Sequence, residues 1–301
     1  MKTDKKMLLV SFSGGETSAY MAKWIIDNWS DKYEIKYVFA NTGQENEETL
    51  EFIENCSKYF NIDVVWVEAL VDMDKGMGTR HKIVDFKSAS RNGEPFEDVI
   101  KKYGIPNQAS PHCNRELKLA PINSYMKSIG WKKYYTAIGI RYDEIDRVND
   151  KRKERKLLYP LIENHPVTKS HINNWWNNQP FRLNLKGYQG NCKTCWKKSF
   201  PKLKKLALEN ESQFDFFKLM EDKYGEYIPE TRLKKIQERG EKWVLPIKFF
   251  RGHISAEQII KDSKNFDGII YDDASNVNYQ INIFDELDGE SCDIFSNCGD
   301  E

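Results

Sequence analysis

The sequence predicts an α/β fold, a doubly wound and mostly parallel sheet followed by a mainly helical C-terminal region. Apolar runs typical of buried strands, at residues 7–10, 35–40 and 63–69, alternate with stretches of helical periodicity. Polar, glycine-containing segments follow the first two runs, and ligands in such sheets bind at the carboxyl ends of strands. We therefore expect a sheet domain over residues 1–200 and a helical region with an acidic tail over residues 201–301.

The first turn, between the strand at residues 7–10 and a helix over residues 16–28, is rich in serine and glycine. Adjacent glycines let the backbone approach an oxyanion closely, and the first N–H groups of the helix point toward it. The turn is too short for the GxxxxGK[ST] loop and has no lysine. We predict an anion site formed by Ser11, Ser13, Gly14, Gly15, Thr17 and Ser18, the alternative being a turn without a ligand.

The second turn, Asn41-Thr42-Gly43, follows the strand at residues 35–40 and precedes renewed helical spacing. Parallel strands place their carboxyl ends at the same edge of a sheet, so this turn is expected beside the first one. The alternative is an ordinary strand-to-helix turn.

Beyond residue 70 the pattern predicts a polar excursion up to residue 110 that crosses over the site. The remaining elements follow from periodicity and from glycine and proline positions. They are a short helix near residues 95–103, a helix over 113–130, a strand at 134–138, a helix at 169–177 and charged helices over 201–240, followed by the acidic residues 285–301.

Composition narrows the class of protein. The formal net charge is zero, so nucleic acid would have to be bound by local patches such as residues 151–156 or 197–205. Mean hydropathy is −0.71, and no apolar run reaches the roughly 18 residues that a membrane span needs. The N-terminus lacks a secretory apolar region. We therefore expect a cytoplasmic protein without a membrane partner.

The chain has six cysteines, which in a reducing compartment indicate metal or redox chemistry before structural disulfides. Cys192 and Cys195 form a CxxC pair, and Cys113 opens a helix earlier in the chain. Thiolates suit an iron–sulfur cluster or zinc, and residue types alone do not separate the two from unmetallated thiols.

Five motifs occur in order. They are Ser13-Gly14-Gly15-x-x-Ser18, Asn41-Thr42-Gly43-x-Glu45-x-x-Glu48-Thr49, Cys113-x-Arg115-x-x-Lys118-x-x-Pro121, Gly139-Ile140-Arg141-x-x-Glu144, and Tyr159-Pro160-Leu161 with Trp175. Together they resemble the phosphoadenylylsulfate (PAPS) and adenylylsulfate (APS) reductase family of the adenine-nucleotide alpha-hydrolase (PP-loop) superfamily. The resemblance covers roughly residues 7–200 and implies that the two turns bind an adenine nucleotide, joined by Lys118, Gly139, Arg141 and Glu144.

Arg141 is the residue best suited to grip a phosphate or sulfate and to act in catalysis, because its guanidinium is planar and permanently charged. The alternative is a surface ion pair with Glu144. Two positions depart from the family. Glu16 would repel a phosphate unless it points away, and Thr17 stands where ATP-cleaving members carry an aspartate.

The resemblance also implies the metal chemistry. Cluster-containing adenylylsulfate reductases bind a [4Fe–4S] cluster with four cysteines, whereas here only Cys113, Cys192 and Cys195 match. His112 stands where a second cysteine would precede Cys113, so one iron would be open or bound by His112. Zinc is the alternative metal. Cys298, followed by Gly299, resembles the family's C-terminal nucleophile.

Three functions are compatible with these motifs. The first is reduction of APS or PAPS, in which Cys298 attacks sulfur and a thioredoxin-like reductant resets the enzyme. The second is a cluster-dependent sulfurtransferase that uses ATP and modifies a base in tRNA or DNA. The third is a non-catalytic nucleotide-binding module. We expect a homo-oligomer in each case.

Overall fold

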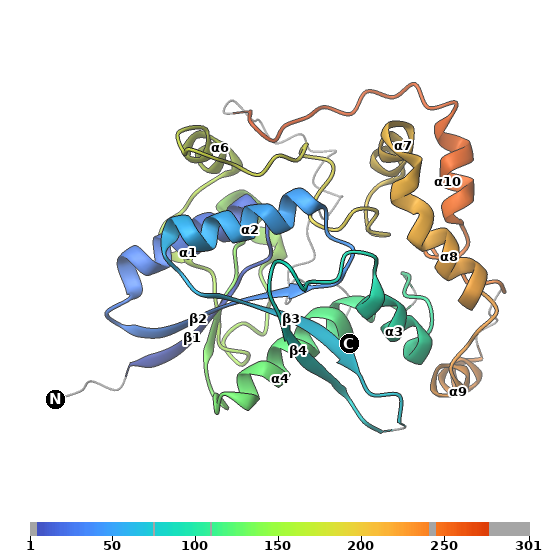
Figure 1. The fold of residues 1–301 in the computed structure, drawn as a ribbon, viewed down its shortest axis with the longest axis horizontal. Coiled ribbons are helices and arrows are strands. Elements are labelled where there is room, and N and C mark those ends of the chain that lie inside the picture. Colours follow the sequence, from blue (N-terminus) through green and yellow to red (C-terminus); the bar gives the residue numbers. More distant parts are fainter. Residues whose placement is uncertain (1–4, 75, 109, 241–244, 277–301) are drawn as a thin grey trace.

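A computed structural model describes residues 5–74, 76–108, 110–240 and 245–276. Its centre is a six-stranded sheet in the order β4-β3-β2-β1-β5-β6 (Figure 1). Neighbouring strands are parallel except for the antiparallel pair β3 and β4. The strands are β1 Lys6–Ser11, β2 Tyr33–Asn41, β3 Val64–Val71, β4 Thr79–Val84, β5 Tyr135–Ala137 and β6 Leu157–Leu158. This α/β sheet confirms the predicted fold class.

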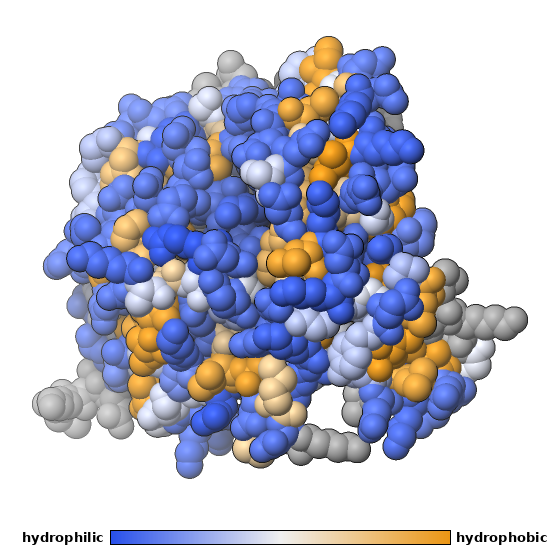
Figure 2. Space-filling model, turned by 45° about the vertical axis from the view of Figure 1, so that its right-hand side comes forward, coloured by the Kyte–Doolittle hydropathy of each residue, from blue (hydrophilic) through white to orange (hydrophobic). Residues whose placement is uncertain are grey.

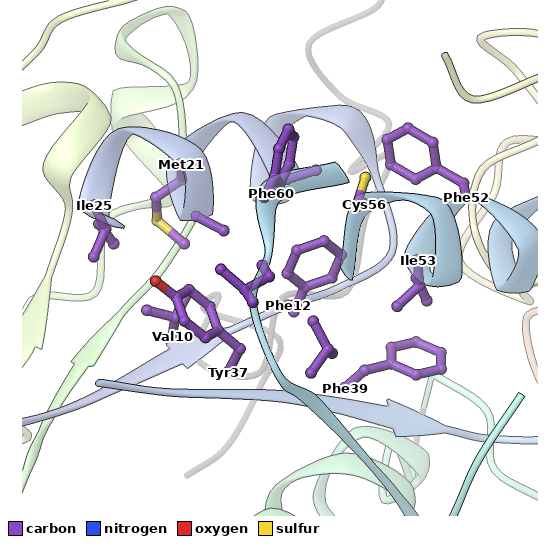
Figure 3. Close-up of a cluster of buried hydrophobic side chains, with 14 of the residues drawn as sticks. Val10, Phe12, Met21, Ile25, Tyr37, Phe39, Phe52, Ile53, Cys56 and Phe60 are labelled. Atoms are coloured by element: carbon purple, nitrogen blue, oxygen red, sulfur yellow. The ribbon is translucent and has the colours of Figure 1, made fainter. Parts of the chain in front are cut away.

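Side chains alternate between the two faces of the sheet, as the period of a strand requires. Leu8 and Val10 face a cluster that includes side chains of three helices, whereas Leu9 faces a second cluster on the other side (Figure 3). The first face is covered by α1 Glu16–Trp29, α2 Glu47–Phe60 and α6 Lys169–Asn177, and the second by α4 Ala120–Ser128. Both faces are buried, which explains the continuous apolar runs in the sequence.

The chain leaves β1 toward β2 on one side, and β5 pairs with β1 on the other side. This reversal creates a crevice at the carboxyl ends of β1 and β5, where ligands bind in open α/β sheets. The turn before α1 and the segment after β5 both lie there.

The stretch at residues 70–110 contains an edge strand, β4, that its sequence does not predict. Helix α3 Glu94–Tyr103 lies where the short helix near residues 95–103 is predicted. β4 was missed because only its two end residues, Thr79 and Val84, are buried, so it carries no apolar run. The helix predicted from residue 113 begins as a π-helical turn over Arg115–Leu119 and continues as α4.

The C-terminal helices complete a core that begins in the first half of the chain. Phe96 and Val99 of α3 lie in one hydrophobic cluster with Leu203 and Phe217. Residues after 200 therefore share their core with residues 69–117. The helices that contribute to this core are α7 Phe200–Glu209, α8 Asp215–Tyr224 and α10 Ala256–Ser263. Two further helices are α5 Pro160–Glu163, before α6, and α9 Glu230–Arg239, between α8 and α10.

The outer surface is mostly hydrophilic, with hydrophobic side chains gathered in patches between charged ones (Figure 2). Within the described ranges, no helix has the length and apolar character that crossing a membrane requires.

Candidate functional site: two adjoining pockets

The phosphate loop, residues 13–18, is ordered by its own hydroxyl groups. The Ser18 hydroxyl accepts a hydrogen bond from Ser13 N–H (3.2 Å), lies 3.0 Å from the Ser13 hydroxyl, and donates to Gly15 O (2.9 Å). Gly14 has φ +86°, and a Cβ there would lie 2.6 Å from Thr49 Cγ2. The loop therefore requires glycine at position 14, since any side chain would collide with α2.

The loop lines a pocket of about 880 Å³, partly open to solvent, which we call the phosphate pocket. Gly139 and Arg141, after β5, line the same pocket. A Cβ on Gly139 would lie 3.1 Å from Ser18 Cα, so glycine allows this segment to pack directly on the start of α1. Five other predicted residues also line this pocket, namely Ser13, Gly15, Thr17, Ser18 and Glu144. Two predicted residues do not: Ser11 is buried at the end of β1, and Gly14 packs against α2.

Arg141 connects the phosphate loop to the turn that follows β5. Its Nη1 lies 3.4 Å from Thr17 Oγ1, and its Nε lies 3.0 Å from Asp143 Oδ1. The ion pair with Glu144 is present as well, at 3.4 Å. Arg141 is 14 % exposed, so two acidic neighbours hold a largely buried guanidinium beside the phosphate loop. The ion pair and the pocket position occur together and are not alternatives.

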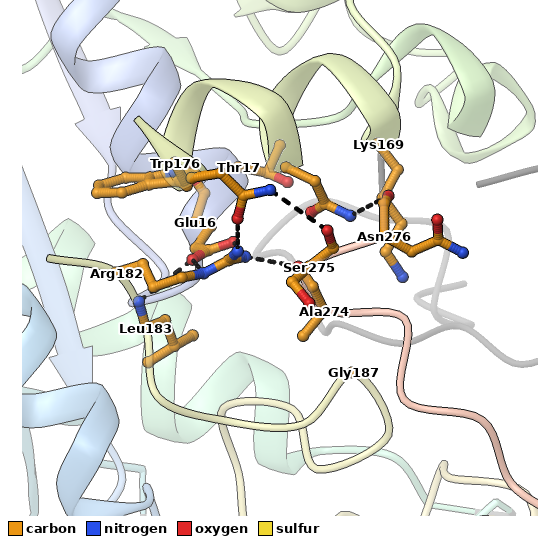
Figure 4. Close-up of polar contacts among 12 residues, drawn as sticks. Glu16, Thr17, Lys169, Trp176, Arg182, Leu183, Gly187, Ala274, Ser275 and Asn276 are labelled. Carbon is orange, nitrogen blue, oxygen red and sulfur yellow. Dashed lines mark hydrogen bonds and ion pairs between the residues drawn. The ribbon is translucent and has the colours of Figure 1, made fainter. Parts of the chain in front are cut away.

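Glu16 lines the phosphate pocket, and its carboxylate is held by Arg182 and Leu183. Its carboxylate accepts hydrogen bonds from Arg182 Nη2 (2.9 Å), Arg182 Nε (3.1 Å) and Leu183 N–H (3.2 Å), as Figure 4 shows. Burial raises the pKa of Glu16, and the positive charges of Arg182 and Lys169 oppose this rise. Arg182 therefore neutralises the carboxylate that would otherwise repel an oxyanion.

Asn41 and Gly43 line neither the phosphate pocket nor the pocket that contains Cys192, so their contact with a nucleotide stays a prediction. Asn41 is fully buried and donates hydrogen bonds to Glu68 Oε1 (2.7 Å) and Ser90 O (2.8 Å). A Cβ on Gly43 would lie 3.0 Å from the backbone of Gly93. Both residues hold the excursion at residues 85–93 against the end of β2, which is a structural role.

The cysteine pocket adjoins the phosphate pocket and encloses about 770 Å³, partly open to solvent. Cys113, Cys192 and Cys195 all line it, although Cys113 is distant from the other two in the sequence. Its walls combine apolar and cationic side chains, namely Phe96, Leu117, Trp196, Phe217, Lys118, Lys197 and Lys198. Thr42 and Lys118, predicted to contact a nucleotide, line this pocket and not the phosphate pocket.

Backbone pairing places the CxxC loop at the end of β2. Glu45 forms an antiparallel bridge with Cys192, and Lys193 N–H donates to Gln44 O (2.9 Å). Asn46 donates two hydrogen bonds to the same loop. Its backbone N–H donates to Asn191 O (3.2 Å), and its side-chain Nδ2 donates to Gly190 O (2.9 Å). A single bridge and three backbone-directed hydrogen bonds thus hold the loop against the second predicted motif.

The Cys192 thiol is neutral in this environment. Desolvation in the pocket and the negative charge of Glu45 raise its pKa to about 12, against the opposing charges of Lys198 and Lys118. A thiol with this pKa is a poor nucleophile, and it deprotonates readily only when a metal replaces the proton.

His112 does not line the cysteine pocket, and its role as a metal ligand stays a prediction. Its Nε2 lies 3.0 Å from Gly104 O and its Nδ1 lies 3.3 Å from Ser110 Oγ. Burial lowers the pKa of His112 to about 4, so the ring is neutral and structural. In the part of the chain that the structure describes, no three His, Cys, Asp or Glu side chains are close enough to hold a single metal ion.

Cys113, Cys192 and Cys195 line one pocket, and thiolates suit an iron–sulfur cluster or zinc. The remaining predicted residue, Cys298, lies outside the described residues.

Several polar side chains of the site were not predicted from the sequence, among them Lys169, Arg182 and Asn191. Lys169 and Arg182 lie beside the phosphate pocket, and Asn191 lines both pockets. Asn191 is the residue immediately before the CxxC pair, and that adjacency was a signal available in the sequence. Lys169 and Arg182 carry no motif, and only the packing of α6 on α1 reveals them.

Comparison with known proteins agrees with this geometry. Residues 7–176 match the model of the phosphoadenosine phosphosulfate reductase domain. The chain is 30 % identical, over 95 % of its length and 94 % of the relative's length, to the uncharacterized nin region protein ORF290 of Escherichia phage lambda. It is 27 % identical to the uncharacterized protein MJ0066 of Methanocaldococcus jannaschii, over 50 % of this chain and 26 % of that protein. The chain therefore belongs to the phosphoadenosine phosphosulfate reductase domain family, within the PP-loop superfamily of adenine-nucleotide alpha-hydrolases.

Proposed function

We propose that this protein is an enzyme that binds an adenine nucleotide in the phosphate pocket and carries out sulfur chemistry at the cysteine pocket. The observation that carries the proposal is the adjacency of the two pockets, which share Asn191 as a common wall. A nucleotide with its phosphates on residues 13–18 would bring a group attached to them toward the three thiols.

The reaction that suits this arrangement best is reduction of an adenylylated sulfate. A thiolate attacks the sulfur atom, the bond from sulfur to the phosphate oxygen breaks, and AMP or its 3′-phosphate leaves. A second thiol then attacks the Sγ atom of the first cysteine, the bond from that Sγ to the sulfonate sulfur breaks, and sulfite leaves. The two thiols are left as a disulfide, which a thioredoxin-like dithiol reduces. Cys298 stays the predicted nucleophile, and Arg141 would stabilise the negative charge on the oxyanion.

Cys113, Cys192 and Cys195 would hold a [4Fe–4S] cluster with one iron lacking a protein thiolate. Such a cluster would supply electrons, or an open iron on which sulfur is held. Lys118 and Lys198 would offset the negative charge of the three thiolates, a role supported by their opposition to the raised pKa of Cys192. Zinc is the alternative metal for the same thiols.

A second candidate function is cluster-dependent sulfur transfer to a base in tRNA or DNA, which the three-thiol arrangement also favours. The two basic stretches expected to contact nucleic acid, residues 151–156 and 197–205, differ in the exposure of their side chains. Lys151, Lys153 and Arg155 are exposed, whereas Lys198 and Lys202 are buried. The turn at residues 151–156 is therefore the better candidate for a nucleic-acid contact.

The test is anaerobic purification followed by an absorption spectrum and analysis of iron, sulfide and zinc. We expect a brown protein with about four irons per chain, whose colour is lost in Cys113→Ala. Cys56→Ala is the matched control, because Cys56 is fully buried in the hydrophobic core next to α1. A colourless protein with about one zinc per chain would overturn the cluster.

Turnover separates the two candidate functions. With APS or PAPS as substrate, release of sulfite and AMP or its 3′-phosphate supports reduction. Incorporation of sulfur into tRNA or DNA that depends on ATP supports transfer. Nucleotide binding without either product would leave the non-catalytic module.

A further inference from the structure

A segment near the end of the described chain, residues 272–276, lies along the phosphate pocket; we call it the strap. Ala274 of the strap is itself a lining residue of that pocket. Figure 4 shows the strap beside α6 and the residues around Glu16. A stretch without helix or strand connects α10 to the strap. Through this stretch the chain returns from the C-terminal helices to α6 and the phosphate pocket (Figure 1).

The strap is anchored mainly through its backbone. Arg182 Nη2 donates to Ala274 O (2.6 Å), and Asn173 Nδ2 donates to Asp273 O (3.1 Å) and Asn276 O (2.8 Å). These anchors belong to α6 and to the loop that follows it. They do not depend on the charge of any strap side chain.

One strap side chain adds a charge contact. The Asp273 carboxylate forms an ion pair with Lys169 Nζ, and both side chains are largely shielded, at 19 % and 11 % exposed. The wall of the pocket leaves room for this carboxylate only because residue 187 is glycine. A Cβ on Gly187 would lie 1.8 Å from Asp273 Oδ1.

Lys169 belongs to the pocket that contains the phosphate loop. It lines that pocket together with Ser13 and Arg141. Burial raises the pKa of Glu16, the first residue of α1, and Lys169 helps Arg182 to oppose that rise. The positive charge of Lys169 is therefore felt at the start of the helix whose N–H groups would receive a phosphate.

We propose that the strap is autoinhibitory: Asp273 occupies on Lys169 the place that an anionic group of the bound nucleotide takes. The inference rests on the proposed nucleotide binding. A carboxylate and a phosphate or sulfate are both oxyanions that bind an ammonium group. Because the strap is tethered beside the pocket, its carboxylate competes at a high effective concentration. A nucleotide whose anionic group reaches Lys169 must displace Asp273, and the strap anchors resist that displacement.

The test uses Asp273→Asn in the full-length protein. The variant removes the competing charge and keeps the backbone anchors to Asn173 and Arg182. Affinities for AMP, ATP and adenosine 3′,5′-bisphosphate are measured by calorimetry at two salt concentrations. We expect binding of at least one of these nucleotides to tighten by about tenfold, the size of one lost charged hydrogen bond.

Two control variants isolate the charge on Lys169. Asp272→Asn alters the neighbouring carboxylate, which accepts from Gly187 N–H (2.9 Å) and Ala274 N–H (3.1 Å), and we expect less than a threefold change. Asp273→Glu keeps the charge and should retain the affinity of the unmodified protein. The gain in Asp273→Asn should shrink at high salt, because added salt already weakens the ion pair in the unmodified protein.

The outcomes distinguish the strap from the proposed function. Equal affinities of the unmodified protein and Asp273→Asn would overturn autoinhibition while leaving nucleotide binding in place. Weaker binding by Asp273→Asn would also overturn it, because Asp273 would then hold Lys169 ready for the ligand. Absence of nucleotide binding by both proteins would overturn both proposals.

Discussion

Asn191 donates a hydrogen bond from Nδ2 to the carbonyl oxygen of Ser13 over 2.8 Å, joining the CxxC loop to the phosphate loop. Asn191 also accepts a backbone hydrogen bond from Asn46 and immediately precedes Cys192. The Asn191 side chain therefore links the phosphate loop, whose backbone would bind a phosphate, to the CxxC loop, which carries two thiols. A shift of either loop is transmitted to the other through this contact.

Asn191→Ala tests that connection. Loss of one hydrogen bond should weaken nucleotide binding by about three- to tenfold, because Ser13 O loses its donor. The same change should increase the rate at which Cys192 and Cys195 react with an alkylating reagent. Calorimetry and mass spectrometry measure the two effects. Asn174→Ala, an exposed position on α6, is the control. Unchanged alkylation in Asn191→Ala would argue against coupling of the loops.

Arg182→Gln tests how the site tolerates Glu16. Without its partner, the carboxylate lies unpaired beside the phosphate loop, and nucleotide affinity should fall by about tenfold. The double variant Glu16→Gln, Arg182→Gln should recover most of that loss, because the repulsive charge is gone. Binding measured by calorimetry in both variants decides the question. A double variant as weak as Arg182→Gln would show that Arg182 acts through another contact.

Gly14→Ala tests the packing of the phosphate loop on α2. The new Cβ would lie 2.6 Å from Thr49 Cγ2 in a backbone conformation with φ +86°. We expect a loss of about 1–3 kcal/mol in the free energy of unfolding. Gly78→Ala is the control, because a Cβ there meets no atom within 4 Å. Denaturant unfolding of both variants provides the comparison, and equal midpoints would contradict a strained loop.

Glu221 should make stability depend on pH. Its carboxylate is 5 % exposed and accepts hydrogen bonds from Phe249 N–H and Ala256 N–H, both at 3.0 Å. Burial raises the pKa of Glu221 from 4.5 to about 7, and these two N–H groups oppose the rise. Because the folded pKa is raised, its contribution is complete below pH 4.5 and is lost as the pH rises through about 7.

The loss should be on the order of 3 kcal/mol between those limits. Glu221→Gln should remove this component of the pH profile, because glutamine does not titrate. Denaturant unfolding at several pH values measures it, with the exposed Glu226→Gln as the control. A Glu221→Gln profile as steep as that of the unmodified protein would assign the pH dependence to other groups.

The elements that build the crevice were predictable because their signals are local. β1, the glycine turn and α1 follow one another within residues 6–29, and each has its own apolar or helical pattern. Strand β4 was not predictable in the same way. It lies at the edge of the sheet and only its two end residues are buried, so burial leaves no pattern in its sequence.

For the site residues, too, assignments based on local motifs differ in outcome from an assignment based on position alone. Ser13, Gly15 and Arg141 were assigned to the phosphate pocket from motifs, and the structure brings them together there. Asn41 was assigned on its position at a strand end. In the structure Asn41 is buried and donates hydrogen bonds to Glu68 and Ser90, and a sequence carries no sign of such partners.

Strand periodicity, glycine turns and short motifs are encoded by neighbouring residues, so the doubly wound sheet, the glycine turn before α1 and the family could be predicted from the sequence. Which cations and thiols meet depends on tertiary packing. Cys113 reaches the CxxC pair because the loop after residue 190 adds to the end of β2. Lys169 meets Asp273 because the chain returns from α10 to α6. Contacts between residues so far apart depend on how the elements pack, and no local pattern records them.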